Sequence, residues 1–164
     1  MTIRGATAAD TATLLQLIRR LAEYERLEDQ LAVTAEALER HLFGPEPYAH
    51  ALIAEHKGRA AGYALYFHTY STFLGRPGVY LEDLFVVPEL RGAGLGRALL
   101  AEVAAVCVRL GGGRLEWAVL DWNRPSIEFY ERLGARPNSS WITYRLDGQA
   151  LGDLAASAAD TMAP

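Results

Sequence analysis

Arg91-Gly92-Ala93-Gly94-Leu95-Gly96-Arg97 stands between an apolar, strand-like run and a helical pattern. The run before it, residues 79–87, is interrupted by Glu82 and Asp83, and the segment after it repeats apolar residues every three or four positions up to Leu110. A glycine-rich turn that joins a strand to a helix exposes backbone N–H groups at the positive end of the helix dipole. This pattern predicts a binding site for an anion, and the two flanking arginines favour a diphosphate.

The standard nucleotide-binding motifs do not fit this turn. A dinucleotide fingerprint that starts at Gly92 needs glycine at its sixth position, where the chain has Arg97. The Gly-Lys-Ser/Thr ending of a triphosphate-binding loop is missing as well. A turn that merely connects two elements is the structural alternative for these glycines.

The composition limits the class of protein. The chain has 164 residues, 51% of them hydrophobic, and a net charge of −4, which favours one globular domain and disfavours nucleic acid as a partner. No apolar run is long enough to predict a membrane span. The single cysteine, Cys107, falls in an apolar helical pattern, which fits a buried thiol in a reducing cytoplasm. The 4 histidines are scattered and predict no metal site.

The remaining pattern indicates an α/β (α+β) fold. We expect helices after Thr7 and Thr34, a hairpin around Lys57-Gly58, strands over residues 79–87 and 115–120, a helix over 125–133, and a last strand over 141–146. Two helices would then precede a mixed, mostly antiparallel twisted sheet flanked by helices. Residues 1–147 would form a single domain, followed by a short tail over residues 148–164.

Two motifs carry a resemblance to a known family. Arg91, Gly94 and Gly96 resemble the Arg/Gln-x-x-Gly-x-Gly/Ala signature of the GNAT N-acetyltransferases, and residues 121–135 are similar to that family's second motif. Across nearly the whole chain, segments such as residues 23–25, 80–83 and 122–130 resemble the diamine (spermidine/spermine) and thialysine acetyltransferase subgroup.

The resemblance implies acetyl-CoA as co-substrate, no metal, and a set of cofactor contacts. Central strands splayed near residues 82–87 would let backbone groups of Leu84, Phe85 and Val86 pair with pantetheine. The turn would hold the pyrophosphate, and Asn123, Ser126 and Tyr130 would lie near the reactive end. The pyrophosphate residues are Arg91, Gly92, Ala93, Gly94, Leu95, Gly96 and Arg97. Relatives of this kind are commonly homodimers, and Tyr63, Phe67 and Trp141 are candidate interface residues.

The proposed chemistry needs a proton acceptor and a proton donor. A primary ammonium with a pKa near about 10.4 must lose a proton before it attacks a thioester. Glu82, expected to be partly desolvated beside the cofactor, is the candidate base, whereas Asp83 should alternate to the opposite face with a structural role. Tyr130 matches the family's general acid. The alternatives are an ion pair for Glu82 and a packing role for Tyr130.

The acceptor is the least specified part of the site. Tyr24, Glu25 and Glu82 would bind an amine, but Ser71 and Ser139-Ser140 stand where polyamine-acetylating relatives carry acidic residues. A polyamine, a diamine and a thialysine- or lysine-like amino acid therefore all stay open as acceptors. Two further functions stay open: a non-catalytic acyl-CoA sensor and a protein N-acetyltransferase.

Overall fold

The computed structural model describes residues 1–158. By its internal contacts the chain divides into two compact units, Met1–Ala118 and Val119–Pro164. The first unit contains a five-stranded sheet whose strands follow one another in chain order. These strands are β1 (Thr2–Gly5), β2 (His50–His56), β3 (Arg59–Ser71), β4 (Arg76–Val86) and β5 (Leu115–Trp117). Neighbours pair antiparallel except β4 and β5, which are parallel.

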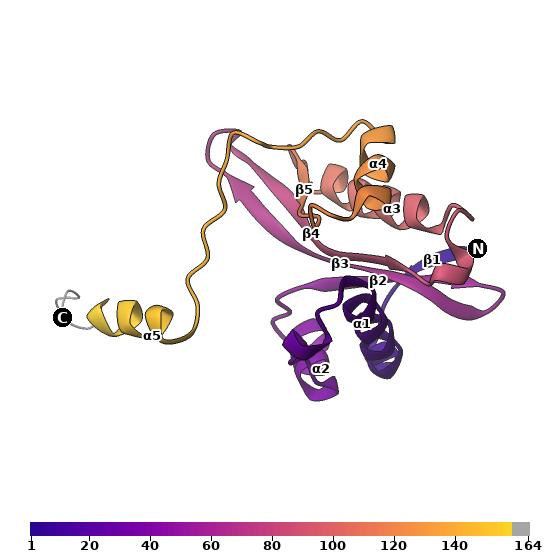
Figure 1. Ribbon diagram of the computed structural model, residues 1–164, viewed down its shortest axis with the longest axis horizontal. Coiled ribbons are helices and arrows are strands. Elements are labelled where there is room, and N and C mark those ends of the chain that lie inside the picture. The colour runs from indigo at the N-terminus through magenta and orange to yellow at the C-terminus, as the bar shows by residue number, and fades with distance from the viewer. Residues whose placement is uncertain (159–164) are drawn as a thin grey trace. The chain divides into compact units, whose positions relative to one another are not determined.

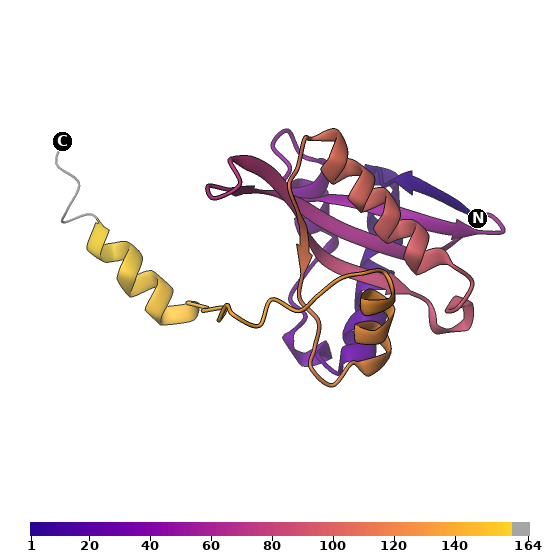
Figure 2. The same cartoon turned by 90° about the horizontal axis from the view of Figure 1, so that it is seen from above.

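Helices cover both faces of this sheet. Helices α1 (Thr11–Glu25) and α2 (Ala35–Phe43) lie on one face, and α3 (Leu95–Arg109) lies on the other (Figure 1). Seen from above, α3 runs across the sheet (Figure 2). Short 3-10 turns, η1 (Ala8–Asp10), η2 (Glu28–Gln30) and η3 (Pro88–Leu90), connect the elements. The expected class, a mixed and mostly antiparallel sheet flanked by helices, is confirmed.

Local signals account for the helix boundaries. The backbone N–H of Thr7 donates to the Asp10 carboxylate at 2.8 Å, and the Thr34 hydroxyl accepts from the Ala37 N–H at 3.2 Å. Both contacts satisfy donors that have no partner at the start of a helix. Apolar residues at helical spacing, including Leu14 and Leu17 of α1, are buried in the core. The predictions for α1, α2, the β2–β3 hairpin and α3 are confirmed.

The sheet begins before the first helix, so the expectation that two helices precede it is wrong. β1 pairs antiparallel with β2, with Thr2 opposite Glu55. Three of its four residues are not hydrophobic, so the strand carries no apolar alternation. Arg4 fixes it: the guanidinium contacts both Asp10 and Glu55 at 2.8 Å, which holds the pKa of the Asp10 carboxyl well below its ordinary value.

β4 is irregular at its acidic pair. The register against β3 shifts between Leu65, which faces Asp83, and Tyr66, which faces Leu81, so Glu82 has no partner of its own. This is a β-bulge, which twists the strand and resets the alternation of its side chains. The parallel ladder with β5 ends at Leu81. Beyond Leu81, β4 pairs with β3 alone among the described strands, over the residues where the sequence predicted a splayed sheet.

Over its described residues, 119–158, the second unit holds two helices, α4 (Arg124–Arg132) and α5 (Gly148–Ser157). The predicted helix over residues 125–133 is confirmed, and the tail begins as a helix; residues 159–164 lie outside the described part of the chain. The predicted last strand is wrong, since residues 141–147 pair with no strand among residues 1–158. Apolar alternation specifies a strand only where a neighbouring edge accepts its hydrogen bonds.

No helix among residues 1–158 combines the length and the apolar character that crossing a membrane requires.

Candidate active site

The turn before α3 has the geometry of an anion site. Gly92 and Gly94 have φ values of 81° and 85°, in the left-handed region that favours glycine. A Cβ atom at either position would meet no atom within 4 Å, so the space beside this backbone is open. The first intrahelical bond runs from the Ala98 N–H to the Gly94 carbonyl. The N–H groups of residues 95–97 therefore lie free of helical partners at the positive end of α3.

The two flanking arginines differ in what they contact. The Arg91 guanidinium lies 4.1 Å from the centre of the Tyr24 ring and 5.9 Å from that of Phe85, and its Nε donates to the Val86 carbonyl at 3.2 Å. Arg91 thereby ties the turn to α1 by a cation–π contact. The Arg20–Glu89 ion pair makes a second link between α1 and this connection.

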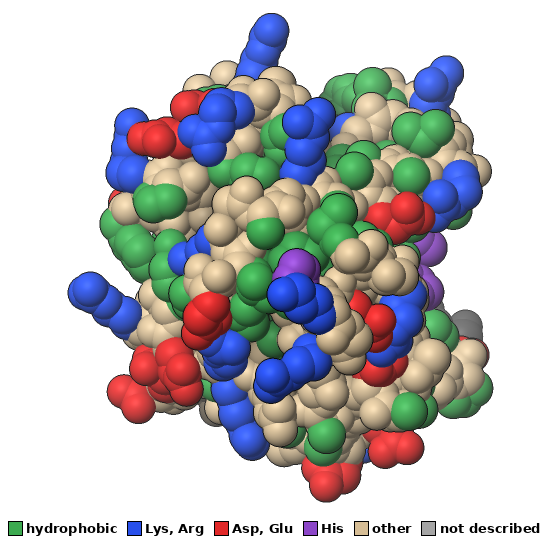
Figure 3. Space-filling view, turned by 90° about the vertical axis from the view of Figure 1, so that its right-hand side faces the viewer, with side chains coloured by type: hydrophobic (Ala, Val, Ile, Leu, Met, Phe, Trp, Pro, Cys, Tyr) green, Lys and Arg blue, Asp and Glu red, His purple; other side chains and the backbone are tan. Residues whose placement is uncertain are grey.

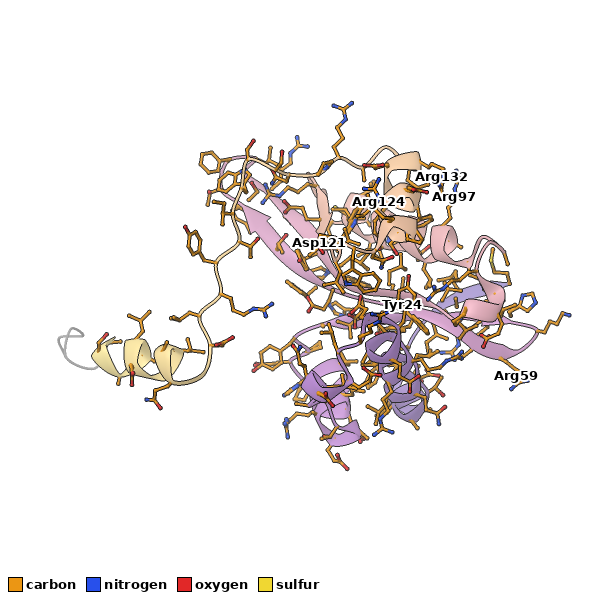
Figure 4. All side chains as sticks on the ribbon, in the orientation of Figure 1. Tyr24, Arg59, Arg97, Asp121, Arg124 and Arg132 are labelled. Carbon is orange, nitrogen blue, oxygen red and sulfur yellow. The ribbon has the colours of Figure 1, made fainter. Side chains whose placement is uncertain are left out.

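The other basic side chains at this end of the sheet are exposed. Arg97 lies on the first turn of α3 and Arg59 follows the β2–β3 turn, both on the same side of the molecule (Figure 4). Figure 3 looks onto that side, where several Lys and Arg side chains are spread over the surface. Asp and Glu side chains lie among them, so the charge nearest the turn is that of Arg91 and Arg97, which adds to the helix dipole in favouring an anionic ligand.

One edge of β4 is open beside the turn. The Val86 carbonyl accepts from Arg91 and the Val87 N–H donates to Ala61 of β3, so consecutive residues face opposite edges of the strand. By this alternation the backbone N–H and C=O groups of Leu84 and of Val86 face away from β3, and those of Phe85 face towards it. Since the β5 ladder ends at Leu81, the N–H and C=O of Leu84 and the N–H of Val86 are placed to pair with an extended ligand, while the Val86 carbonyl already accepts from Arg91.

The buried phenol of Tyr63 contacts one carboxylate, that of Asp83, and feels the charge of two others. The Tyr63 hydroxyl donates to Asp83 Oδ2 at 2.9 Å, and the charges of Glu25, Glu82 and Asp83 all raise the pKa of Tyr63. Burial raises the pKa of Asp83 to about 6, with smaller contributions from the charges of Glu82 and Glu25. Burial also raises the pKa of Glu25.

The surroundings expected of the acidic pair are partly exchanged. Asp83 lies in regular register with β3 and accepts the Tyr63 hydroxyl, whereas Glu82 is the extra residue of the bulge. The desolvation predicted for Glu82 belongs to Asp83 instead, since Glu82 is exposed. Two acidic residues next to each other in an apolar strand were the signal for this bulge. No sequence pattern indicates that Tyr63 is buried beside this acidic pair; its predicted place was a subunit interface.

The remaining candidate residues lie in the second unit, on one side of α4. Asn123 caps the helix, and its side-chain oxygen accepts from the Ser126 N–H at 3.3 Å. Ser126 and Tyr130 follow at helical spacing from Asn123, so the three residues share one face. Tyr130 is half-buried and its ring packs against Phe129, with centroids 5.2 Å apart.

The described residues 1–158 hold no group of three or more His, Cys, Asp or Glu side chains arranged to bind a metal ion.

Comparison with known proteins places this geometry in a family. A model of the acetyltransferase (GNAT) family matches residues 12–135. The chain belongs to this family. As a GNAT protein it is an acetyltransferase, and the predicted likeness to the thialysine and diamine subgroup is confirmed by its relatives.

Two curated relatives cover nearly the whole GNAT chain. The thialysine N-epsilon-acetyltransferase of Sus scrofa is 40% identical over an alignment of 164 positions. The alignment covers 93% of this chain and 96% of that protein. The Bos taurus protein of the same name is 41% identical with the same coverage. Among solved structures, an integron cassette protein from V. cholerae has a TM-score of 0.79 at 24% identity, over 94% of this chain and 96% of that one, and shares the fold.

Proposed function

We propose that this GNAT protein transfers the acetyl group of acetyl-CoA directly to a primary amine of a small molecule. The observation that carries the proposal is the layout of β4 and its continuation. A carboxylate cluster at Glu82 and Asp83 is followed by an open strand edge, and then by an anion-binding turn at the start of α3. An amine, a pantetheine arm and a pyrophosphate need these three features in this order.

For the cofactor, acetyl-CoA supplies a thioester whose carbonyl carbon the free amine attacks. The peptide groups of Leu84 and Val86 would pair with the pantetheine arm, and Phe85 would contribute through its buried ring. Residues Gly92 to Arg97 would hold the pyrophosphate through backbone N–H groups, helped by the exposed Arg97. Arg91 would act by fixing the turn against Tyr24. Asn123 and Ser126 are proposed to lie near the reactive end.

For the acceptor, the ammonium group would bind among Tyr24, Glu25, Glu82 and Asp83. Exposed Glu82 would receive the cation from solvent and order the water around it. The pKa of Asp83, about 6, suits a group that is ionised at neutral pH and can still take up a proton. We therefore propose that Asp83 accepts the amine proton, directly or through water, and that Glu82 assists.

The acceptor class is proposed to be a lysine- or thialysine-like amino acid or short diamine. The relatives named above support this class. Ser71, which stands where a polyamine site carries an acid, is buried, and its hydroxyl accepts from the Leu74 N–H at 3.2 Å. Its role is to close the β3–β4 turn, so this position offers no charge to a distant ammonium group.

An acceptor panel tests this assignment. With acetyl-CoA fixed, initial rates of CoA thiol release would be measured for thialysine, lysine, putrescine, spermidine and a lysine-containing peptide. We expect kcat/KM for thialysine to exceed that for spermidine by about tenfold or more, the difference that one missing ionic contact makes. A preference for spermidine would overturn the acceptor class, and a preference for the peptide would favour a protein N-acetyltransferase.

We propose Tyr130 as the general acid that protonates the departing sulfur. Tyr130→Phe keeps the ring and its packing against Phe129 but removes the proton. We expect kcat to fall about 100-fold or more with little change in KM for either substrate, because the lost proton transfer matters in the transition state. Tyr70→Phe, at an exposed position, is the matched control. Full turnover by Tyr130→Phe would leave Tyr130 with a packing role only.

We further propose a homodimer that forms through exposed apolar residues. Trp141 is 71% exposed and Phe67 is half-buried beside Tyr80, whereas the third expected interface residue, Tyr63, is completely buried and is excluded. Light scattering should give twice the chain mass for the wild type and the single chain mass for Trp141→Ser. A wild-type protein that is monomeric at all concentrations would contradict the dimer.

We also propose a cytoplasmic protein. Cys107 is buried and its thiol donates to the Arg114 carbonyl at 3.2 Å, which fits a reduced thiol used in packing.

A further inference from the structure

Tyr63 is a completely buried tyrosine in the middle of the sheet. Its residue exposure is 0%, and it is among the largest side chains that are fully enclosed. A buried hydroxyl without a hydrogen-bond partner is costly, and buried tyrosines usually have one. Here the partner is Asp83, whose Oδ2 accepts the hydroxyl at 2.9 Å.

The surrounding strands hold the Tyr63 ring in a single position. Tyr63 faces Phe85 across the β3–β4 ladder, and the two ring centroids are 6.4 Å apart. The same regular register places Asp83 opposite Leu65, two residues along from Phe85 and so on the same side of the sheet as Tyr63. A ring that is packed against Phe85 and enclosed by the core holds its hydroxyl at a constant point beside the bulge. The regular pairing of β3 with β4 up to Asp83 brings its carboxylate to that point, and the bulge begins at the next residue, Glu82.

The hydrogen bond makes the two carboxylate oxygens of Asp83 inequivalent. Oδ2 accepts the phenol, which leaves Oδ1 as the oxygen available to an acceptor amine. The charged and titratable groups that act on Asp83 come from three elements: Tyr63 of β3, Glu82 of β4 and Glu25 of α1. The two glutamates favour the protonated acid, and the phenol alone among these three favours the carboxylate.

We propose that Tyr63 is a positioning residue for the transfer reaction: its hydroxyl fixes one oxygen of Asp83 and directs the other to the acceptor amine. This inference rests on the function proposed above. It assigns a catalytic consequence to a residue that touches neither substrate. A phenylalanine here would fill the same space and leave Asp83 free to turn and to take up a proton.

Tyr63→Phe tests the proposal through the pH profile. Removal of the hydrogen bond raises the pKa of Asp83, so the acidic limb of kcat/KM should move up by about one pH unit. At about pH 6 the lower ionised fraction should reduce the rate about fivefold, whereas above about pH 8, where Asp83 is ionised in either form, only the loss from its freed orientation should remain. KM for acetyl-CoA should not change. A profile that keeps its midpoint would overturn the proposal.

Tyr66→Phe is the matched control. Tyr66 is also buried in β3, but it lies on the other side of the sheet, where Arg109 and Glu102 of α3 act on it. Its loss of a hydroxyl should leave the midpoint of the pH profile unchanged. An equal shift in both variants would mean a general effect on the sheet and would also overturn the proposal.

A second measurement separates this inference from the proposed function. Carbon NMR of the Asp83 carboxyl follows its titration without any turnover. If the wild type acetylates no amine, the proposed function fails, and the NMR midpoint still tests Tyr63: a rise in Tyr63→Phe supports control of Asp83 by the phenol, and an unchanged midpoint refutes it.

Discussion

Asp83→Asn is expected to remove most amine acetylation and, at the same time, to make the protein more stable at alkaline pH. The amide cannot take up the amine proton, so kcat/KM should fall about 100- to 1000-fold. Its oxygen can still accept the Tyr63 hydroxyl, so the local structure should persist. Asp29→Asn, at an exposed position, is the control for both effects and should change neither.

The stability gain follows from the direction of the pKa shift. The pKa of Asp83 rises from 3.8 to about 6 on folding, so the folded state disfavours the ionised form. The contribution of this group is most favourable below about pH 4 and declines as the pH rises through about 6. Two pKa units correspond to about 3 kcal/mol of stability. The cost of burying the N–H2 group of asparagine offsets part of this gain.

Urea unfolding measures this gain. We expect the free energy of unfolding of Asp83→Asn to exceed that of the wild type by about 1 to 2 kcal/mol near about pH 8, and by about half as much near about pH 5. A variant that is less stable than the wild type at both pH values would contradict the account of Asp83 as a strained carboxylate. Retention of full activity would exclude it as proton acceptor.

Gly94→Ala is expected to weaken acetyl-CoA binding about tenfold to 100-fold, which corresponds to about 1.4 to 2.8 kcal/mol. Its φ is 85° and the space around its missing Cβ is open, so a methyl group would enter the region where the phosphate oxygens need to approach the backbone. Calorimetry with acetyl-CoA gives the dissociation constant, and kcat at saturating acetyl-CoA should change little.

The control for backbone strain lies at the other end of the same helix. Gly111, just after α3, has a φ of 70° and equally open surroundings. Gly111→Ala should therefore lose a similar amount of stability, about 1 kcal/mol, without any loss of affinity for acetyl-CoA. If the two variants bind acetyl-CoA equally well, the turn before α3 is not the pyrophosphate site.

The parts of the fold that the sequence predicted are those with strong local signals. Capping residues Thr7 and Thr34, the Lys57-Gly58 turn and the glycines before α3 each specify the backbone within a few residues. The strand β1 was missed because its pairing with β2 depends on residues far along the chain, with Arg4 linking Asp10 to Glu55. Residues 141–146 have an alternating apolar pattern but form no strand, because no neighbouring strand edge among residues 1–158 pairs with them.

The site was predictable in its chemistry but not in its detail. The turn from Arg91 to Arg97 and the acidic pair were both visible in the sequence. Strand alternation alone could not predict the bulge at Glu82, where one extra residue resets the alternation between Asp83 and Leu81. The register of β3 against β4 depends on the packing of whole strands, so neither the hydrogen bond from Tyr63 nor the burial of Asp83 could be read from residue order.

The decisive measurement is the release of CoA thiol when the full chain is mixed with acetyl-CoA and thialysine near about pH 8, with the acetylated amine quantified in the same sample. The proposed direct transfer predicts equal amounts of thiol and acetylated amine, with rates that saturate in both substrates. Tight binding of acetyl-CoA without thiol release for any primary amine would contradict an acetyltransferase acting on small amines and would favour a non-catalytic acyl-CoA sensor.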